Sequence, residues 1–361
     1  MASRERLRAV LSGGVPDRTP FFPCIAPDHA CEATGHSFEE ALARPDLAMT
    51  WTLEANLLYG SDATRVRPTP PRSWFERKEV RREGDRLAQV DRATGQIEGH
   101  FDVMGGGALI PSSPPAPVRA LEDAQRIAFP SADEIIGEGC LDAARSATDA
   151  AHERGLFVVG MAAGQTLNAL VARMGDAGTA MVAMVDQPGL VRAVFRKATD
   201  ASIELIAAYA RIGVDGIYIG DSYASASVIS PAMYEAYCVP EYRRAAEACR
   251  ARGLLVYKHC CGDYNPLLEI VRREPLDGIE GIDPTSGMSV ARTRAALGNA
   301  KCMIGGVSCL SLLNGSPEDV RAEARRCIRE GGPRYVLGSA CAVPRHSPRE
   351  NLIAMGRAAL P

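Results

Sequence analysis

The feature of this sequence that most limits the possible folds is a regular alternation of short apolar runs with helical patterns, from about residue 154 onward. Six runs have the length of a buried strand: Leu156–Met161, Gly216–Gly220, Leu254–Tyr257, Gly278–Asp283, Cys302–Val307 and Tyr335–Gly338. The stretches between them, such as Pro188–Arg211 and Ser316–Glu330, carry apolar residues at helical spacing. This alternation predicts a parallel sheet, because each helix returns the chain to the edge where the previous strand began.

A further apolar run near the N-terminus, Pro20–Ile25, adds a strand to these six. So many parallel strands fit a closed barrel better than an open sheet, and we predict an α/β fold of the (β/α)8 TIM-barrel class. Segment Asp62–Val103 breaks the alternation, because it is rich in charge and has turn signals at Glu83–Asp85 and Ala93–Gly95. It predicts an antiparallel hairpin elaboration that is too short and polar for a core of its own. We therefore predict one domain over residues 1–361, with a hairpin insertion at 62–103.

The charge balance argues against two classes of partner. Lys and Arg number 41 and Asp and Glu number 44, which leaves a formal net charge of −3. Such a balance favours neither nucleic acid nor an anionic membrane. No apolar run reaches the ~18 residues of a membrane-spanning helix, and the polar opening MASRERLRAVLSGG lacks the apolar core of a signal peptide. We expect a cytoplasmic enzyme that acts on a small molecule.

The eleven cysteines do not fit a disulfide framework. Their number is odd, and the cytosol keeps thiols reduced. Four lie in helical patterns, where cysteine is typically a small buried hydrophobe: Cys140, Cys238, Cys249 and Cys327. The adjacent Cys260 and Cys261 beside His259 need a different explanation.

Metal-ligand residue types follow two of the predicted strands. In a (β/α)8 barrel the functional site lies where the strands end. His259 and Cys261 follow the run LLVY, and Cys341 follows YVLG. Zinc accepts one imidazole with two thiolates and leaves a fourth position for water or substrate. In an extended turn alternate side chains point the same way, so His259 and Cys261 can share a metal while Cys260 points elsewhere.

The alternative is that His259 is a hydrogen-bonded core histidine and that both cysteines only fill space. Three further residues at strand ends also carry two interpretations each. Asp221 could orient a substrate or only cap a turn, and Tyr223 could line the pocket or only lie on the loop. Asp283 could be a fourth, oxygen ligand that substrate displaces, or only a turn residue before Pro284.

Two other features receive structural interpretations. By strand alternation Lys258 faces away from the side of His259, and we expect it to form a structural ion pair. An N-terminal group also has metal-like composition: Cys24, Asp28, His29, Cys31 and His36. Its spacing matches no compact zinc pattern. Because a predicted strand ends at Ile25, we expect this group to line the substrate pocket.

Several motifs together resemble the uroporphyrinogen decarboxylase superfamily over nearly the whole chain. They are the opening Arg4–Arg6 with Gly14–Pro20, a degraded Gly-Pro-x-Thr loop at Gly164–Thr166, the Asp-bearing loop Ile219–Asp221 with Ile229–Pro231, and the closing Ser347–Leu352. Where the decarboxylases carry an arginine-rich motif for substrate carboxylates, this chain has Phe21–Pro27 without arginine. The sequence therefore resembles the corrinoid-dependent branch, the methylcobamide:coenzyme M methyltransferases.

That resemblance implies a zinc-dependent methyltransferase with zinc on His259, Cys261 and Cys341. It would move a methyl group between a corrinoid and a small thiol, amine, betaine or methoxyl compound. The corrinoid (cobalamin) would arrive on a separate protein, because the sequence contains no Asp-x-His-x-x-Gly cobalamin motif. Two alternatives remain, a lyase like uroporphyrinogen decarboxylase and a non-catalytic zinc- or corrinoid-binding protein on the same fold.

Overall fold

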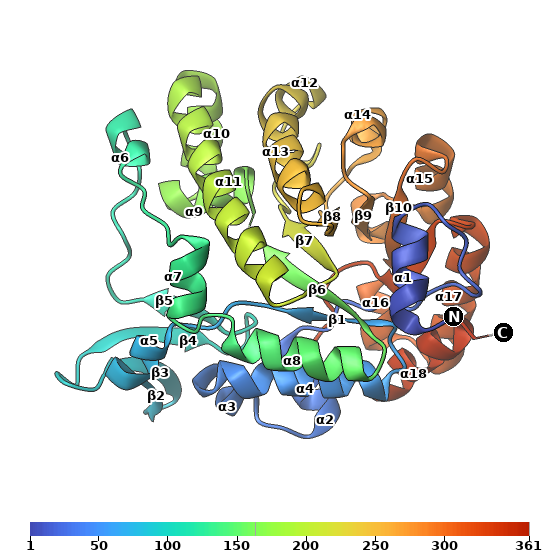
Figure 1. Ribbon diagram of the computed structural model, residues 1–361, viewed down its shortest axis with the longest axis horizontal. Helices are drawn as coiled ribbons and strands as arrows, with labels where there is room; N and C mark the ends of the chain where they lie inside the picture. The colour runs from blue at the N-terminus through green and yellow to red at the C-terminus, as the bar shows by residue number, and fades with distance from the viewer. Residues whose placement is uncertain (163, 361) are drawn as a thin grey trace.

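A curved sheet of seven parallel strands forms the centre of the protein, in the order β1-β6-β7-β8-β9-β10-β11 (Figure 1). The computed structural model describes residues 1–162 and 164–360. The strands are β1 (Ala63–Val66), β6 (Phe157–Ala162), β7 (Gly216–Gly220), β8 (Leu255–His259), β9 (Gly278–Ile282), β10 (Cys302–Val307) and β11 (Tyr335–Ser339). Six of them lie within a residue or two of the apolar runs in the sequence, because buried parallel strands are apolar on both faces.

The N-terminal segment closes this sheet between its two edges. Phe21 forms a parallel bridge with Leu337 of β11, and its carbonyl accepts a hydrogen bond from the N–H of Asp62 at the start of β1. The expected strand Pro20–Ile25 is reduced to this one bridge, since Pro20 and Pro23 have no N–H to donate to a ladder. The prediction of an α/β barrel with an antiparallel elaboration is confirmed.

The elaboration has different bounds from those we predicted. A four-stranded antiparallel sheet consists of β2 (Lys78–Glu83), β3 (Arg86–Asp91), β4 (Ile97–Asp102) and β5 (Ala108–Pro111). The bounds 62–103 were wrong at both ends, because Ala63–Val66 is a barrel strand and the sheet continues to Pro111. The N-terminal bound was wrong because Thr64 and Arg65 are buried polar residues, so that strand β1 does not form an apolar run in the sequence. That residues 1–361 form a single domain stays a prediction.

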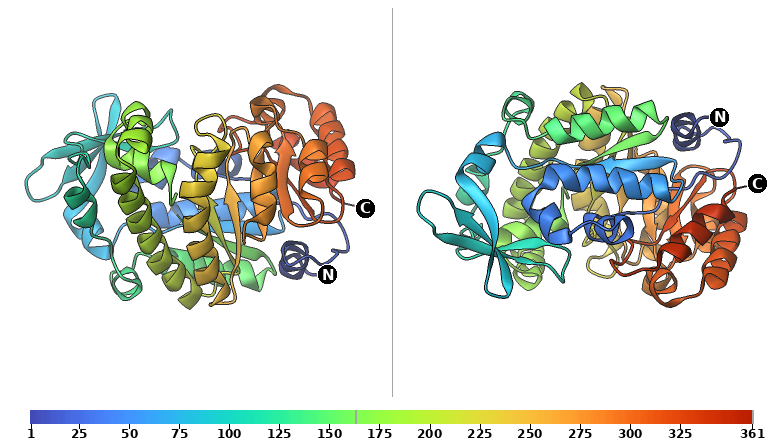
Figure 2. Two further views of the ribbon diagram at one scale, coloured as in Figure 1. Left: turned by 90° about the horizontal axis from the view of Figure 1, so that it is seen from above. Right: turned by 90° about the horizontal axis from the view of Figure 1, so that it is seen from below.

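Helices pack around the outside of the barrel (Figures 1 and 2). They are α1 (Ser3–Leu11), α2 (Pro27–Thr34), α3 (Phe38–Ala43), α4 (Pro45–Leu58), α5 (Arg72–Arg77), α6 (Leu121–Gln125), α7 (Ala132–Gly137), α8 (Asp142–Glu153), α9 (Leu167–Met174), α10 (Ala177–Asp186), α11 (Pro188–Arg211), α12 (Pro231–Met233), α13 (Val239–Arg250), α14 (Leu268–Arg273), α15 (Val290–Leu297), α16 (Cys309–Asn314), α17 (Pro317–Gly331) and α18 (Arg349–Ala358), with a π-helical turn at Tyr234–Cys238 and 3₁₀ turns at Asn265–Leu267 and Pro284–Ser286. In the part of the chain that the structure describes, no helix combines the length and apolarity needed to cross a bilayer.

Helix α1 fills the end of the barrel where the strands begin. Leu7, Val10 and Leu11 pack with buried residues of the strands, among them Phe157 and Ile304. The four-stranded sheet lies at the other end of the molecule (Figure 1). Since α1 fills the amino end of the barrel, only the carboxyl ends of the strands remain to form a site.

Candidate metal centre

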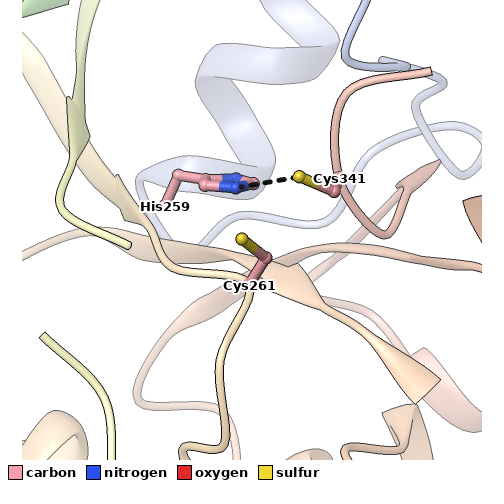
Figure 3. A group of neighbouring side chains, drawn as sticks. All are labelled: His259, Cys261 and Cys341. Carbon is pink, nitrogen blue, oxygen red and sulfur yellow. Dashed lines mark hydrogen bonds between the residues drawn. The ribbon is translucent and has the colours of Figure 1, made fainter. Parts of the chain in front are cut away.

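Three side chains converge at the carboxyl ends of β8 and β11. His259 is the last residue of β8, Cys261 follows two residues later, and Cys341 lies in the loop after β11. One ligand atom of each lies within 4.8 Å of the others, and the Cys341 Sγ is 3.7 Å from His259 Nε2. Both sulfur atoms point toward the imidazole ring (Figure 3). Among the described residues this is the only group of three such ligands with metal-like spacing.

A carboxylate on the neighbouring strand orients the imidazole. The Oε2 of Glu280, in β9, lies 3.0 Å from His259 Nδ1, which directs Nε2 toward the two thiols. A carboxylate in this position is typical of metal-binding histidines. Burial raises the pKa of Glu280, but Arg65 and His259 outweigh this effect and hold the pKa below its ordinary value. Glu280 is therefore ionised at neutral pH.

Arg65 of β1 balances the charge of that carboxylate. Its guanidinium pairs with Glu280 Oε1, and both side chains are fully buried. The same guanidinium donates to the carbonyl of Pro23 at 3.0 Å and lies 4.1 Å from the centre of the Phe22 ring. Sequence reasoning missed Arg65 and Glu280. Glu280 could have been found from its position, because it is a charged residue in the middle of the apolar run GIEGI.

Two neighbours restrict the position of the imidazole further. The ring of Tyr218 stacks on His259 with 5.6 Å between ring centres. Gly281 has φ of +99°, and a Cβ at this position would collide with the carbonyl of Cys260. Glycine at 281 therefore allows β9 to approach the turn that carries Cys261.

The protonation states of the three residues are coupled. Hydrogen bonds from Cys341 and then His259 lower the pKa of Cys261 to about 4. Burial lowers the pKa of His259, but hydrogen bonds with Cys261 and Glu280 outweigh it and raise the pKa to about 9. Cys261 raises the pKa of Cys341. The site thus stabilises a thiolate beside a histidine, and this donor set fits zinc.

Asp283 lies outside this group. Its Oδ1 accepts a hydrogen bond of 2.9 Å from the N–H of Thr285, so the carboxylate caps the turn that begins at Pro284. The proposed oxygen ligand is therefore absent from the converging set of described residues. This arrangement matches the alternative interpretation, a turn residue before a proline.

Asp221 lies beside the group, and its carboxylate binds other parts of the chain. It accepts hydrogen bonds from the N–H and hydroxyl of Thr166, the N–H of Asn168 and the hydroxyl of Tyr242. Its own N–H donates to the carbonyl of His259 at 3.1 Å. With both oxygens engaged, Asp221 positions the loop before α9. Tyr223 is 39% exposed on that side and is not part of the group.

Two other expectations concern the neighbours of His259 in the chain. The structural ion pair of Lys258 is confirmed, because its Nζ lies 2.7 Å from the buried carboxylate of Glu274. Cys260 is buried and its thiol faces the carbonyl of Ser222 at 3.4 Å, away from the ligand group.

The N-terminal residues with metal-like composition are dispersed. His29 Nε2 lies 3.0 Å from the hydroxyl of Tyr59, and His36 Nε2 lies 3.1 Å from the carboxylate of Glu54. Cys24 lies in the wall near the ligand group, and its N–H donates to the hydroxyl of Ser339. Only this part of the segment comes near the site.

The sequence is similar to both methyltransferases and decarboxylases. It is 30% identical over 164 residues to a methylated-thiol–coenzyme M methyltransferase of Methanosarcina mazei, covering 44% of this chain and 42% of that protein. It is 25% identical over 223 residues to a uroporphyrinogen decarboxylase of Chlorobium luteolum, covering 60% of this chain and 61% of that one. The chain thus spans less than two thirds of the relatives it matches.

The fold is similar to that of a solved methyltransferase from Methanosarcina mazei. The TM-score is 0.75 at 21% identity, over 99% of this chain and 98% of that one. The family model for uroporphyrinogen decarboxylase (URO-D) matches residues 103–359. This match covers most of the barrel, including all three residues of the candidate metal centre. The chain therefore belongs to the uroporphyrinogen decarboxylase (URO-D) family.

Proposed function

We propose that this protein is a zinc-dependent methyltransferase that moves a methyl group between a corrinoid and a small substrate. The observation that carries the proposal is the convergence of His259, Cys261 and Cys341 at the carboxyl end of the barrel, within 4.8 Å of one another. Methyltransferase relatives that act with methylated thiols and with methylcobamide support it.

His259, Cys261 and Cys341 would hold the zinc ion. When bound to two thiolates and a neutral imidazole, zinc supplies a Lewis-acid position that lowers the pKa of a thiol substrate and leaves its sulfur electron-rich. Glu280 accepts the Nδ1–H of His259 and so leaves Nε2 directed at the centre, where zinc would take the place of the Nε2 proton. Arg65 keeps Glu280 ionised, and the ring of Tyr218 shields one face of the imidazole from water.

We propose two classes of small substrate. A thiol would be bound as the methyl acceptor, whereas an amine, betaine or methoxyl compound would be the donor. We propose that the corrinoid is brought by a separate protein. All eleven cysteines are free, which fits a reducing compartment such as the cytoplasm.

Elemental analysis tests the metal assignment. We expect one zinc per chain in the wild type and its loss in the variants His259→Ala, Cys261→Ser and Cys341→Ser. The matched control is Cys260→Ser, which removes an adjacent thiol that faces away from the centre and should retain zinc. Full zinc content in Cys261→Ser would remove the assignment.

Spectroscopy tests the reaction. The zinc-loaded protein is incubated with methylcobalamin and a panel of thiols, and in reverse with cob(I)alamin and methylated amines, betaines and methoxyaromatics. Interconversion of the two cobalamin spectra that depends on His259 and Cys341 would support the proposal. No conversion with any partner, with a cognate corrinoid protein present, would favour a binding protein.

A further inference from the structure

A cavity of about 370 Å³ includes in its wall Arg65, whose ion pair with Glu280 leads to the candidate metal centre. It lies between the helices α3 and α4, the end of β1 and the antiparallel sheet. Most of its wall is apolar and partly aromatic, and includes Phe38, Leu42, Met49, Trp74, Phe101 and Leu109. This is the composition of a site for the apolar body of a small molecule.

The charged residues in the wall of this cavity are Arg65 and Arg67. They differ in whether an anionic side chain pairs with them. Arg65 is neutralised by Glu280. For Arg67, just beyond β1, none of the residues that the structure describes provides a salt bridge or a hydrogen-bond acceptor. Burial lowers the pKa of Arg67, and the carboxylate of Asp28 is near enough to act against this without touching it. Arg67 is partly buried, and a guanidinium in an apolar wall is normally paired with an anion, which the described part of the chain does not supply.

One buried ion pair connects the cavity with the metal centre. Arg65 lines the cavity and also binds the carboxylate that orients His259. Cys24 lies close to Arg65, Arg67 and Glu280. Burial raises the pKa of its thiol to about 11, but Arg65 and Arg67 are close enough to lower it in part. An anionic molecule in the cavity would therefore have its charged end at Arg67.

We propose that this cavity binds a small organic anion with an apolar or aromatic body, such as a substituted benzoate, whose carboxylate or sulfonate pairs with Arg67. Arg67 fits this role because its planar guanidinium binds such groups through two parallel hydrogen bonds. The inference rests on the proposed function, because the bound anion is taken to be the methyl donor or acceptor.

Calorimetric titration of the zinc-loaded protein tests this inference without any methyl transfer. The probes are 3-methoxybenzoate, 3-methoxybenzenesulfonate and the uncharged 3-methoxybenzamide. We expect one of the anions to bind at one site, and the amide to bind at least about tenfold more weakly, since it lacks the charge that Arg67 requires. The two anions distinguish a carboxylate site from a sulfonate site.

Variants of Arg67 decide whether that side chain is responsible. Arg67→Gln should weaken binding of the anion by about tenfold to a hundredfold and leave binding of the amide unchanged. Arg67→Lys keeps the charge and should retain part of the affinity. The control is Arg86→Gln, which removes the same charge from an exposed position on β3 and should bind like the wild type.

Stability of the free protein gives a second measurement. Because Arg67 makes no ion pair or hydrogen bond with the described residues, Arg67→Gln removes no contact and should melt at the same temperature as the wild type or higher. An equal affinity of anion and amide, or of wild type and Arg67→Gln, would overturn the inference, as would no binding of either anion. Methyl transfer that proceeds without anion binding would remove this inference alone. Binding that depends on Arg67, without methyl transfer, would support the site and contradict the proposed reaction.

Discussion

Replacing Glu280 by glutamine tests how the candidate metal centre is oriented. The carboxylate has two partners, His259 Nδ1 at 3.0 Å and the guanidinium of Arg65. Glutamine keeps the shape and one acceptor oxygen but removes the charge. We therefore expect zinc to bind about 10- to 100-fold more weakly, which is the usual effect of losing a carboxylate behind a metal-binding histidine.

The same change should lower the free energy of unfolding. Arg65 and Glu280 are both fully buried, with side-chain exposures of 3% and 1%. Breaking a buried pair by removing one partner costs ~3 to 5 kcal/mol, because the other charge is left without compensation. The double variant Arg65→Met/Glu280→Gln removes both charges and should regain much of this stability, although its zinc affinity should stay low.

Competition with a chromophoric chelator measures zinc affinity, and urea denaturation measures the free energy of unfolding. The matched control is Glu269→Gln, at a carboxylate that is 65% exposed and pairs only with Arg272 on its own helix. That variant should differ from the wild type by less than about 1 kcal/mol. If Glu280→Gln bound zinc like the wild type and unfolded at the same urea concentration, the orienting role of Glu280 would be refuted.

Three further predictions concern neighbouring residues. Lys258→Met leaves Glu274 buried without its cation and should destabilise the protein by ~3 kcal/mol or more in urea, with zinc content unchanged; equal stability would show that the pair is not needed. Asp221→Asn places an N–H₂ group against backbone donors and should cost ~1 to 3 kcal/mol, again with zinc retained, and loss of zinc without loss of stability would contradict a positioning role. Uroporphyrinogen should not be decarboxylated, since segment Phe21–Pro27 contains no arginine that could bind its carboxylates; carbon dioxide released from that substrate at an enzymatic rate would contradict this prediction.

The barrel and the grouping of His259, Cys261 and Cys341 could both be predicted from the amino-acid sequence. Buried parallel strands are apolar on both faces, so their positions can be read from short runs such as Cys302–Val307. Because all parallel strands end at one edge, residues that follow two different strands are expected to meet. His259, Cys261 and Cys341 could be grouped on this ground alone, and the structure places them together.

The polar residues that surround this group could not be identified without the three-dimensional structure. Arg65 looks in the sequence like a residue of an exposed hairpin, and Glu280 is a lone charge in an apolar strand, since a single sequence does not show which charged side chains pair inside a barrel. The pairing joins β1 with β9, which are far apart in the chain and come together only when the barrel closes. Asp283 shows the converse. Its position at a strand end is favourable, but its carboxylate is turned toward its own backbone by a local hydrogen bond that no spacing rule predicts.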